Sequence, residues 1–282
     1  MGKILNAREL LSDAGKNHYA VAALNTNSAN YDMTRAIIEA ADAENSPVII
    51  QEYEHNSVYR GFRYFIRQAE YLSETVKIPI ALALDHGESV SSVMQAAKAG
   101  FTHVMLDNSD FTFDEYIIRI RELIYHLKPM GISIEAEIGA MARQEELQKG
   151  TSCTALSDIQ KFLKAVEPDL LAVSVGTSHG VHQEQNNINF SLVEELRAGT
   201  SVPLVMHGTC GVSLDSISKL VKAGMRKINF GEGLRTGYIR YFNEFSAALE
   251  HQGHPWRIME AVKDKLKEDI RAIIRAINSG SR

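Results

Sequence analysis

The chain has 282 residues, of which 45% are apolar and 23% are charged, and its formal net charge is -5 at pH 7. This composition is typical of a globular protein and excludes a disordered or fibrous chain. The sequence has no uninterrupted apolar run of transmembrane length, and its 30 Lys and Arg residues do not exceed its 35 Asp and Glu residues. We therefore expect neither a membrane span nor a nucleic-acid partner.

Eight short apolar segments recur along the chain, and each is too short to form a helix. Most of them lack the polar alternation of half-exposed strands, which is typical of parallel strands buried on both faces. The predicted strands are 19–24, 47–50, 78–84, 103–106, 131–138, 170–175, 202–206 and 227–230.

A segment with helical spacing of its apolar residues follows each predicted strand. Ser or Asp stands near several helix starts, and Gly100 and Gly224 follow helix ends, where glycine is favoured. The predicted helices are 31–44, 61–75, 89–99, 113–127, 157–166, 191–198, 213–223 and 234–250.

Eight alternating strand and helix units indicate an α/β protein with a (β/α)8 TIM barrel. A doubly wound open sheet is the structural alternative, but it usually carries a glycine fingerprint after the first strand. Here that position reads Asn25, Thr26 and Asn27. No linker or change of composition divides the chain, so we expect residues 1–282 to form a single domain.

The last part of the chain, 256–278, has the pattern of one more amphipathic helix. This helix would pack over the barrel's own surface or contact another subunit, and we expect a homo-oligomer, either a dimer or a tetramer. Its apolar stripe consists of Ile258, Val262, Leu266, Ile270, Ile273, Ile274 and Ile277.

The two cysteines, Cys153 and Cys210, are too few for a disulfide framework in a chain of this length. The first residues, MGKILNAREL, lack the basic segment and apolar run of a signal peptide. We therefore expect a cytoplasmic protein.

Polar residues gather at the predicted strand ends, and in a barrel of this type the loops after the strands form the active face. His86, His179 and His207 stand at the ends of strands three, six and seven, and carboxylates stand at the ends of strands three, four and five. Neutral imidazoles with carboxylates suit a zinc-like ion. The sequence therefore predicts a metal site, whereas His18 and His103 lie at the opposite end and are interpreted as structural.

Asp85 directly precedes His86 near the end of its strand, where the chain bends and both side chains can reach the mouth. It is a candidate acid/base group, or alternatively a residue that supports a metal ligand. No His-x-His pair follows the first strand, which makes hydrolase chemistry the weaker enzymatic interpretation.

Five motifs, in this order on these strands, resemble those of the metal-dependent (class II) aldolases, which include fructose-bisphosphate and tagatose-bisphosphate aldolases. They are LALDHGES (82–89), IEAEIG (134–139), GTSHGV (176–181), LVMHG (204–208) and KIN (227–229). The resemblance implies a lyase that reversibly cleaves a ketose or ketose (bis)phosphate into a dihydroxyacetone (phosphate)-type donor and an aldehyde.

The resemblance also implies a role for each matching residue. His86, His179 and His207 would bind Zn2+ or another divalent ion, and Glu137 and Asp107 would belong to an alternate or second metal position. Asp85 would move the hydroxyl proton at the bond that breaks, and Glu145 would exchange the carbon-bound proton. The metal would spread the developing negative charge as an enediolate, which Asn229 would hold. The substrate-binding candidates are Asn25, Gly180, Gly208, Cys210, Gly211, Asn229, Gly231 and Glu232.

A Schiff-base lysine is not needed for this chemistry. Lys227, on the last predicted strand, is the nearest candidate for one. Because it stands at the strand's start, we expect it to point toward the stability face of the barrel, away from the active loops.

The chain departs from the family where relatives bind the 1-phosphate. Gly180, Gly208 and Gly211 can still form a backbone anion nest, but three side chains differ: Cys210 replaces serine, Glu232 replaces threonine and Gln183 replaces lysine. A carboxylate within about 4 Å of a phosphate would cost roughly 4 kcal/mol per unit charge pair.

Two interpretations of this departure remain open. Either Glu232 turns away and the amides suffice for phosphate, or the donor lacks that phosphate and Glu232 accepts hydrogen bonds from its hydroxyls. Two further alternatives are a catalytically altered barrel that only binds a sugar, and another metal-dependent lyase or hydrolase.

Overall fold

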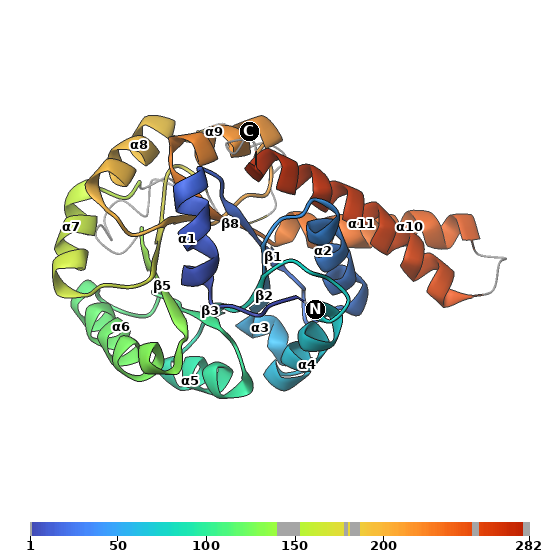
Figure 1. The fold of residues 1–282 in the computed structure, drawn as a ribbon, viewed down its shortest axis with the longest axis horizontal. Helices are drawn as coiled ribbons and strands as arrows, with labels where there is room; N and C mark the ends of the chain where they lie inside the picture. The colour runs from blue at the N-terminus through green and yellow to red at the C-terminus, as the bar shows by residue number, and fades with distance from the viewer. Residues whose placement is uncertain (1, 140–152, 178–179, 181–186, 250–253, 279–282) are drawn as a thin grey trace.

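The computed structural model describes residues 2–139, 153–177, 180, 187–249 and 254–278. Eight parallel strands close into a barrel in chain order, and the last strand pairs with the first. Helices surround the barrel (Figure 1). The predicted TIM barrel is confirmed.

Most strands agree with the sequence prediction to within a few residues, but two of them continue farther. The second and third strands run to Tyr53 and Gly87, because backbone pairing continues past the point where the apolar pattern stops: Gln51 is paired with Ala83 and Tyr53 with Asp85. The strands are β1 (Val21–Asn25), β2 (Val48–Tyr53), β3 (Ile80–Gly87), β4 (His103–Leu106), β5 (Ser133–Ile138), β6 (Leu170–Val173), β7 (Leu204–Met206) and β8 (Met225–Phe230).

The predicted helices are all present, and several begin at a side-chain cap. Asn30, Ser89 and Thr112 each accept a hydrogen bond from a backbone N–H in the first turn, which satisfies one of the donors that a helix start leaves open. The helices are α2 (Tyr31–Ala43), α4 (Phe62–Ser73), α5 (Val90–Ala99), α6 (Phe113–Leu127), α7 (Leu156–Ala165), α8 (Phe190–Gly199), α9 (Leu214–Ala223), α10 (Glu232–Leu249) and α11 (Pro255–Ile277).

One long helix, α1 (Ala7–Asn17), was not predicted from the sequence, nor were the short α3 (Glu54–Ser57) and the 3-10 turn η1 (Lys128–Met130). In Figure 1, α1 lies across the middle of the ring of helices. Its buried Leu10 and Leu11 belong to one apolar cluster with Val21 and Ala81 of the barrel strands. This helix therefore covers the end of the barrel at which the strands begin.

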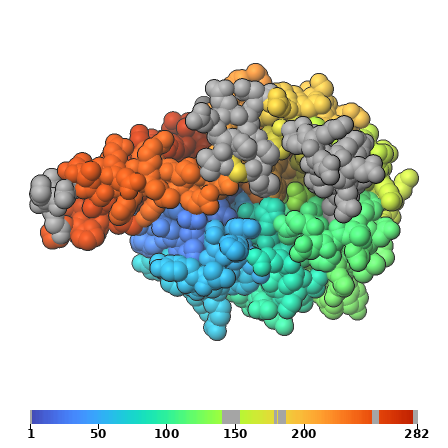
Figure 2. Space-filling view, turned by 180° about the vertical axis from the view of Figure 1, so that it is seen from behind, coloured from blue at the N-terminus to red at the C-terminus, as the bar shows by residue number. Residues whose placement is uncertain are grey.

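The apolar stripe predicted for the C-terminal helix is confirmed, since its members are buried or packed against the core. The helix packs on α2, α9 and α10, and ion pairs such as Arg271 with Glu44 and Lys263 with Glu39 tie it to α2. Figures 1 and 2 show α10 and part of α11 extending beyond the ring as an arm. Among the described helices, none is both long enough and apolar enough to cross a membrane.

Candidate active site

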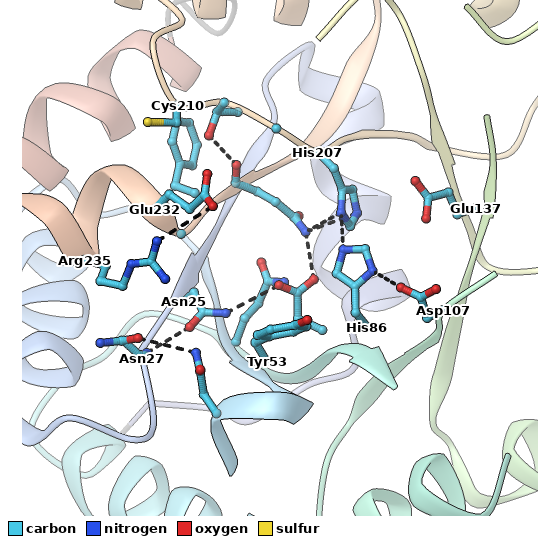
Figure 3. A pocket seen from close by; sticks show the side chains of 18 of the residues that line it. Asn25, Asn27, Tyr53, His86, Asp107, Glu137, His207, Cys210, Glu232 and Arg235 are labelled. Atoms are coloured by element: carbon cyan, nitrogen blue, oxygen red, sulfur yellow. Dashed lines mark hydrogen bonds and ion pairs between the residues drawn. The ribbon is translucent and has the colours of Figure 1, made fainter. Parts of the chain in front are cut away.

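The strands end at a cavity of about 490 Å³, which lies at the mouth where the site was predicted (Figure 3). Gly180 and Gly211 are not among its lining residues, although both have the left-handed backbone of an anion nest, with φ 113° and 83°. His179, Glu145 and Gln183 lie outside the described residues. The predicted residues that line the cavity are Asn25, Asp85, His86, Asp107, Glu137, His207, Gly208, Cys210, Asn229, Gly231 and Glu232.

Asp85 and His86 both reach the cavity although they are neighbours in β3. His86 has a φ of 49°, a left-handed backbone conformation that is uncommon for a residue with a side chain, and the pairing of β3 with β4 shifts register between Leu84 and Gly87. The strand therefore bends at its end, and this bend brings both side chains to the mouth.

His86 and His207 face each other across the cavity floor, with Nε2 of His86 3.2 Å from Nδ1 of His207. The other nitrogen of each ring contacts a carboxylate: Nδ1 of His86 lies 2.7 Å from Asp107, and Nε2 of His207 lies 2.9 Å from Glu135. A carboxylate on the outer nitrogen fixes that N–H and leaves the lone pair on the inner nitrogen, as in many metal-binding histidines.

This geometry fits a divalent metal ion. Two nitrogens bound to one tetrahedral zinc at about 2.0–2.1 Å lie roughly 3.3 Å apart, close to the observed separation of 3.2 Å. Asp85, His86 and His207 each offer one ligand atom to this space, and the three atoms lie within 4.8 Å of one another. A cation between the two rings would be bound by both inner nitrogens, in place of the hydrogen bond that otherwise joins them.

The electrostatics of the site also favour a cation. Burial lowers the pKa of His86, but its hydrogen bond to Asp107 and the charges of Asp85 and Glu137 outweigh burial and raise that pKa to about 9. Burial would raise the pKa of Asp107, yet its hydrogen bonds to His86 and Ser109 hold the pKa well below the usual range. The negative charges of the carboxylates around His86 therefore favour a bound positive charge, which a divalent ion would supply.

Asp85 lies between two asparagine side chains. Nδ2 of Asn229 is 3.2 Å from Oδ1 of Asp85, and Nδ2 of Asn25 is 3.4 Å from its Oδ2. Each carboxylate oxygen therefore faces an amide donor, which fixes the plane of the group. Among the described residues, Oδ1 of Asn229 is buried without a hydrogen-bond partner, so this acceptor is available to a ligand hydroxyl.

A buried charged cluster in the barrel supports His207, and the sequence analysis did not identify it. Glu135 is fully buried, and its Oε2 lies 2.7 Å from Nζ of Lys227 and 3.1 Å from Nε2 of His103. Burial would raise the pKa of Glu135, but the charge of Lys227 and its hydrogen bonds to His103 and His207 hold it well below the usual range. Glu135 stays ionised and fixes His207.

The position of Lys227 corrects the sequence prediction. Its side chain is 2% exposed and points into the barrel toward Glu135, not toward the stability face. The alternation of β5 was the available signal, because Ser133, Glu135 and Glu137 share one face of that strand. Since Lys227 is ion-paired and does not line the cavity, it remains unsuited to a Schiff base.

Replacing Lys227 by Met should lower the free energy of unfolding by about 3–5 kcal/mol, because the change leaves the carboxylate of Glu135 buried without its cation. Urea unfolding followed by circular dichroism would measure the loss. The matched control is Lys222→Met on the exposed side of α9. This change should alter the free energy of unfolding by less than about 0.5 kcal/mol. Equal stability of the two variants would contradict the argument.

Several further residues that line the cavity were not predicted from the sequence, among them Asn27, Gln51, Asn56, Thr209 and Arg235. Arg235 is the most consequential, because its Nη2 lies 3.8 Å from Oε1 of Glu232, one turn earlier in α10. In Figure 3, this pair lies with Asn25 and Asn27 on the side away from Asp107 and Glu137. The (i, i+3) spacing of opposite charges was the sequence signal for it.

The chain is similar to known aldolases over nearly its whole length. Residues 5–282 match the family model described as fructose-bisphosphate aldolase class-II. The 6-phospho-5-dehydro-2-deoxy-D-gluconate aldolase of Bacillus subtilis (strain 168) is 32% identical over 275 residues, which cover 95% of this chain and 94% of that protein. A fructose-bisphosphate aldolase of Staphylococcus epidermidis is 30% identical, with 99% of each chain covered.

A solved structure of an aldolase is also similar to this chain over nearly its whole length. The YdjI aldolase of Escherichia coli K12 superposes with a TM-score of 0.85 and 28% sequence identity, and 98% of each chain is covered. The barrel, the paired histidines at its mouth and these similarities lead to one conclusion: the chain belongs to the class II fructose-bisphosphate aldolase family, whose members are metal-dependent lyases.

Proposed function

We propose that this class II aldolase reversibly cleaves a ketose phosphate, with a zinc ion or another divalent ion held by His86, His207 and His179. The facing nitrogens of His86 and His207, 3.2 Å apart with a carboxylate behind each ring, are the observation that carries the proposal. His179 is assigned from its motif alone. Glu137, which lines the cavity, is the candidate for an alternate metal position.

Asp107, also predicted to bind metal, has a different contact in the structure. Its Oδ2 bonds Nδ1 of His86, on the side of the ring away from His207. We infer that Asp107 orients His86 and raises its basicity, as carboxylate partners of metal-binding histidines do.

Asp85 is the proposed proton acceptor for the hydroxyl at the bond that breaks. Asn25 and Asn229 hold its carboxylate, and the unpartnered Oδ1 of Asn229 would accept a hydrogen bond from the donor half of the substrate. The metal, when bound, would supply Lewis-acid stabilisation of the negative charge that cleavage leaves on the donor. Glu145 is proposed to exchange the carbon-bound proton.

The end of the cavity away from Asp107 is proposed to bind the donor's phosphate. Arg235 lines the cavity and supplies a guanidinium there, and its proximity to Glu232 offsets the negative charge that the sequence analysis regarded as an obstacle. The backbone of Gly208, left-handed with φ 71°, lines the same cavity and can add amide donors. A donor without phosphate is the second candidate, because Glu232 also lines the cavity.

Replacing Arg235 by Ala separates these two candidates. If phosphate binds here, the variant should raise KM at least tenfold for ketose phosphates and leave KM for the matching unphosphorylated ketoses unchanged, because a charged hydrogen bond is worth about 1.5–3 kcal/mol. Steady-state cleavage of both substrate sets would measure the effect. Arg240→Ala, farther along α10 and outside the cavity lining, is the control. Equal rates on both sets, with no response to the Arg235 change, would favour the unphosphorylated donor.

We further propose that the enzyme is a cytoplasmic homo-oligomer, either a dimer or a tetramer. Ile239 and Phe242 of α10 and Trp256 of α11 are large apolar side chains exposed on these two helices, which suits a subunit contact. Within the described part of the chain, neither Cys153 nor Cys210 forms a disulfide, as is usual in a reducing compartment.

A further inference from the structure

Glu52 is a buried carboxylate near the active site that the proposed chemistry does not use. The residue as a whole is 1% exposed. Its neighbours in β2, Gln51 and Tyr53, line the cavity, whereas Glu52 does not. Alternation along the strand directs it instead toward the loop that joins β1 to α2.

The loop that contacts Glu52 has an unusual backbone. Asn27, Ser28 and Ala29 are three consecutive residues with side chains and left-handed φ values of 51°, 68° and 49°. Such residues normally adopt this conformation singly, and each is disfavoured by contact between its Cβ and the backbone. A run of three persists only where the surroundings impose it.

One oxygen of Glu52 provides that constraint. Oε2 accepts hydrogen bonds from Oγ1 of Thr26 at 2.6 Å and from the backbone N–H of Ala29 at 3.0 Å. Gln68 of α4 holds the same turn from the other side, because its Nε2 donates to the carbonyl oxygen of Ala29 at 3.0 Å. The backbone N–H groups of Ser28 and Ala29 both stabilise the ionised carboxylate of Glu52. Successive backbone N–H groups that converge on one anion form a nest, and here the anion is the protein's own carboxylate.

The loop fixed in this way carries two side chains of the cavity. Oδ1 of Asn25 accepts a hydrogen bond from the backbone N–H of Asn27 at 2.9 Å, which orients its amide so that Nδ2 faces Asp85. Asn27 also lines the cavity, and its Oδ1 accepts from Nδ2 of Asn56 at 3.4 Å. A chain of contacts thus runs from Glu52 through the loop to Asp85.

A contribution to the stability of the fold does not explain why a carboxylate is buried at position 52. Burial raises its pKa from 4.5 to about 7, although Thr26 and the loop amides stabilise the ionised form, and the charge of Asp85 adds to the rise. Gln68 and Thr34, on the helices that hold the loop, are neutral. Among the described residues, Oε1 of Glu52 is buried without a partner. Because the folded-state pKa is raised, this group lowers stability as pH rises from 4.5 toward 7.

We propose that Glu52 is a positioning residue, which holds the β1–α2 loop so that Asn25 orients Asp85 for proton transfer. Its kinetic consequence rests on the proposed aldolase function, whereas its effect on the loop does not. Glu52 touches neither the cavity nor the proposed metal ligands, so its removal should alter turnover without removing metal.

The test compares Glu52→Leu, Glu52→Gln and Thr26→Val with the wild type. Glu52→Leu should lower kcat about tenfold and change KM and metal content less than twofold, because one oriented hydrogen bond to a charged group is lost in the transition state. Glu52→Gln should stay within about threefold of the wild type, since an amide oxygen can replace Oε2. The kcat of Thr26→Val should lie between the values of the two Glu52 variants. Thr200→Val is the matched control and should leave kcat unchanged, because the Thr200 hydroxyl accepts a hydrogen bond from the backbone N–H of Val202, in the turn before β7.

A double-mutant cycle tests whether Glu52 acts through Asn25. Asn25→Ala should mask most of the loss in Glu52→Leu, because both changes remove the same orientation of Asp85. Additive losses would overturn the proposal, as would wild-type kcat in Glu52→Leu or an equal loss in Glu52→Gln.

Hydrogen exchange provides a test that does not depend on activity. Amides in residues 27–30 should exchange at least about tenfold faster in Glu52→Leu than in the wild type, and unchanged protection would overturn the proposal. If the wild type cleaves no ketose, the proposed function fails while this measurement still decides the role in the loop. Glu52→Gln should also remove the loss of stability between pH 4.5 and about 7, and an unchanged pH dependence of the unfolding midpoint would count against a buried, ionising Glu52.

Discussion

Replacing Asp85 by Ala should lower kcat by about 10² to 10⁴ while the metal stays bound, because a positioned acid/base group contributes that much to proton transfer. Asp85 is the carboxylate held by Asn25 and Asn229 at the cavity floor. The measurement is steady-state cleavage of the best substrate, with the metal content of each preparation determined by elemental analysis.

The control for this change is Asp110→Ala, an exposed aspartate in the loop after β4, which should keep both kcat and metal content. Full activity of Asp85→Ala would refute the proton role. Loss of metal from that variant would instead make Asp85 a ligand, which its place within 4.8 Å of the histidine nitrogens also allows geometrically.

Replacing His86 by Ala should remove the metal and reduce activity by about 10³-fold or more, since Lewis-acid stabilisation is worth several kcal/mol. His86 faces His207 at 3.2 Å and contacts Asp107 at 2.7 Å, so its ring supplies one of the two nitrogens on which the proposed metal site depends. Zinc titration followed by dialysis would measure the affinity, and chelation of the wild type should produce the same loss reversibly.

His126→Ala, on the exposed side of α6, is the matched control and should bind one equivalent of metal like the wild type. Stoichiometric metal together with normal turnover in His86→Ala would show that the cation is held elsewhere. A variant that keeps metal but loses activity would assign His86 to substrate orientation.

The order of strands and helices could be predicted because the barrel needs only a repeated pattern of apolar segments and helix caps. The ends of β2 and β3 could not, because polar residues such as Gln51 and Asp85 interrupt the pattern while backbone pairing continues. The helix α1 was missed although Asn6 and Glu9 form a capping box at its start, because its few apolar residues gain their stability from contact with the barrel strands, which sequence spacing does not report.

The candidate active site can likewise be divided into features that the sequence predicts and features that it does not. The repeated apolar segments and the five motifs were enough to predict the fold and the family. Asp85, His86 and His207 could also be placed at one mouth, since residues after parallel strands share one end of a barrel. The contacts across the barrel became visible in the folded chain alone: Asp107 and Glu135 lie behind the two histidines, Lys227 beside Glu135, Arg235 beside Glu232, and Glu52 under the β1–α2 loop. The physical reason is that strand twist and bends set the direction of each side chain, and burial sets its charge, whereas sequence spacing encodes neither directly.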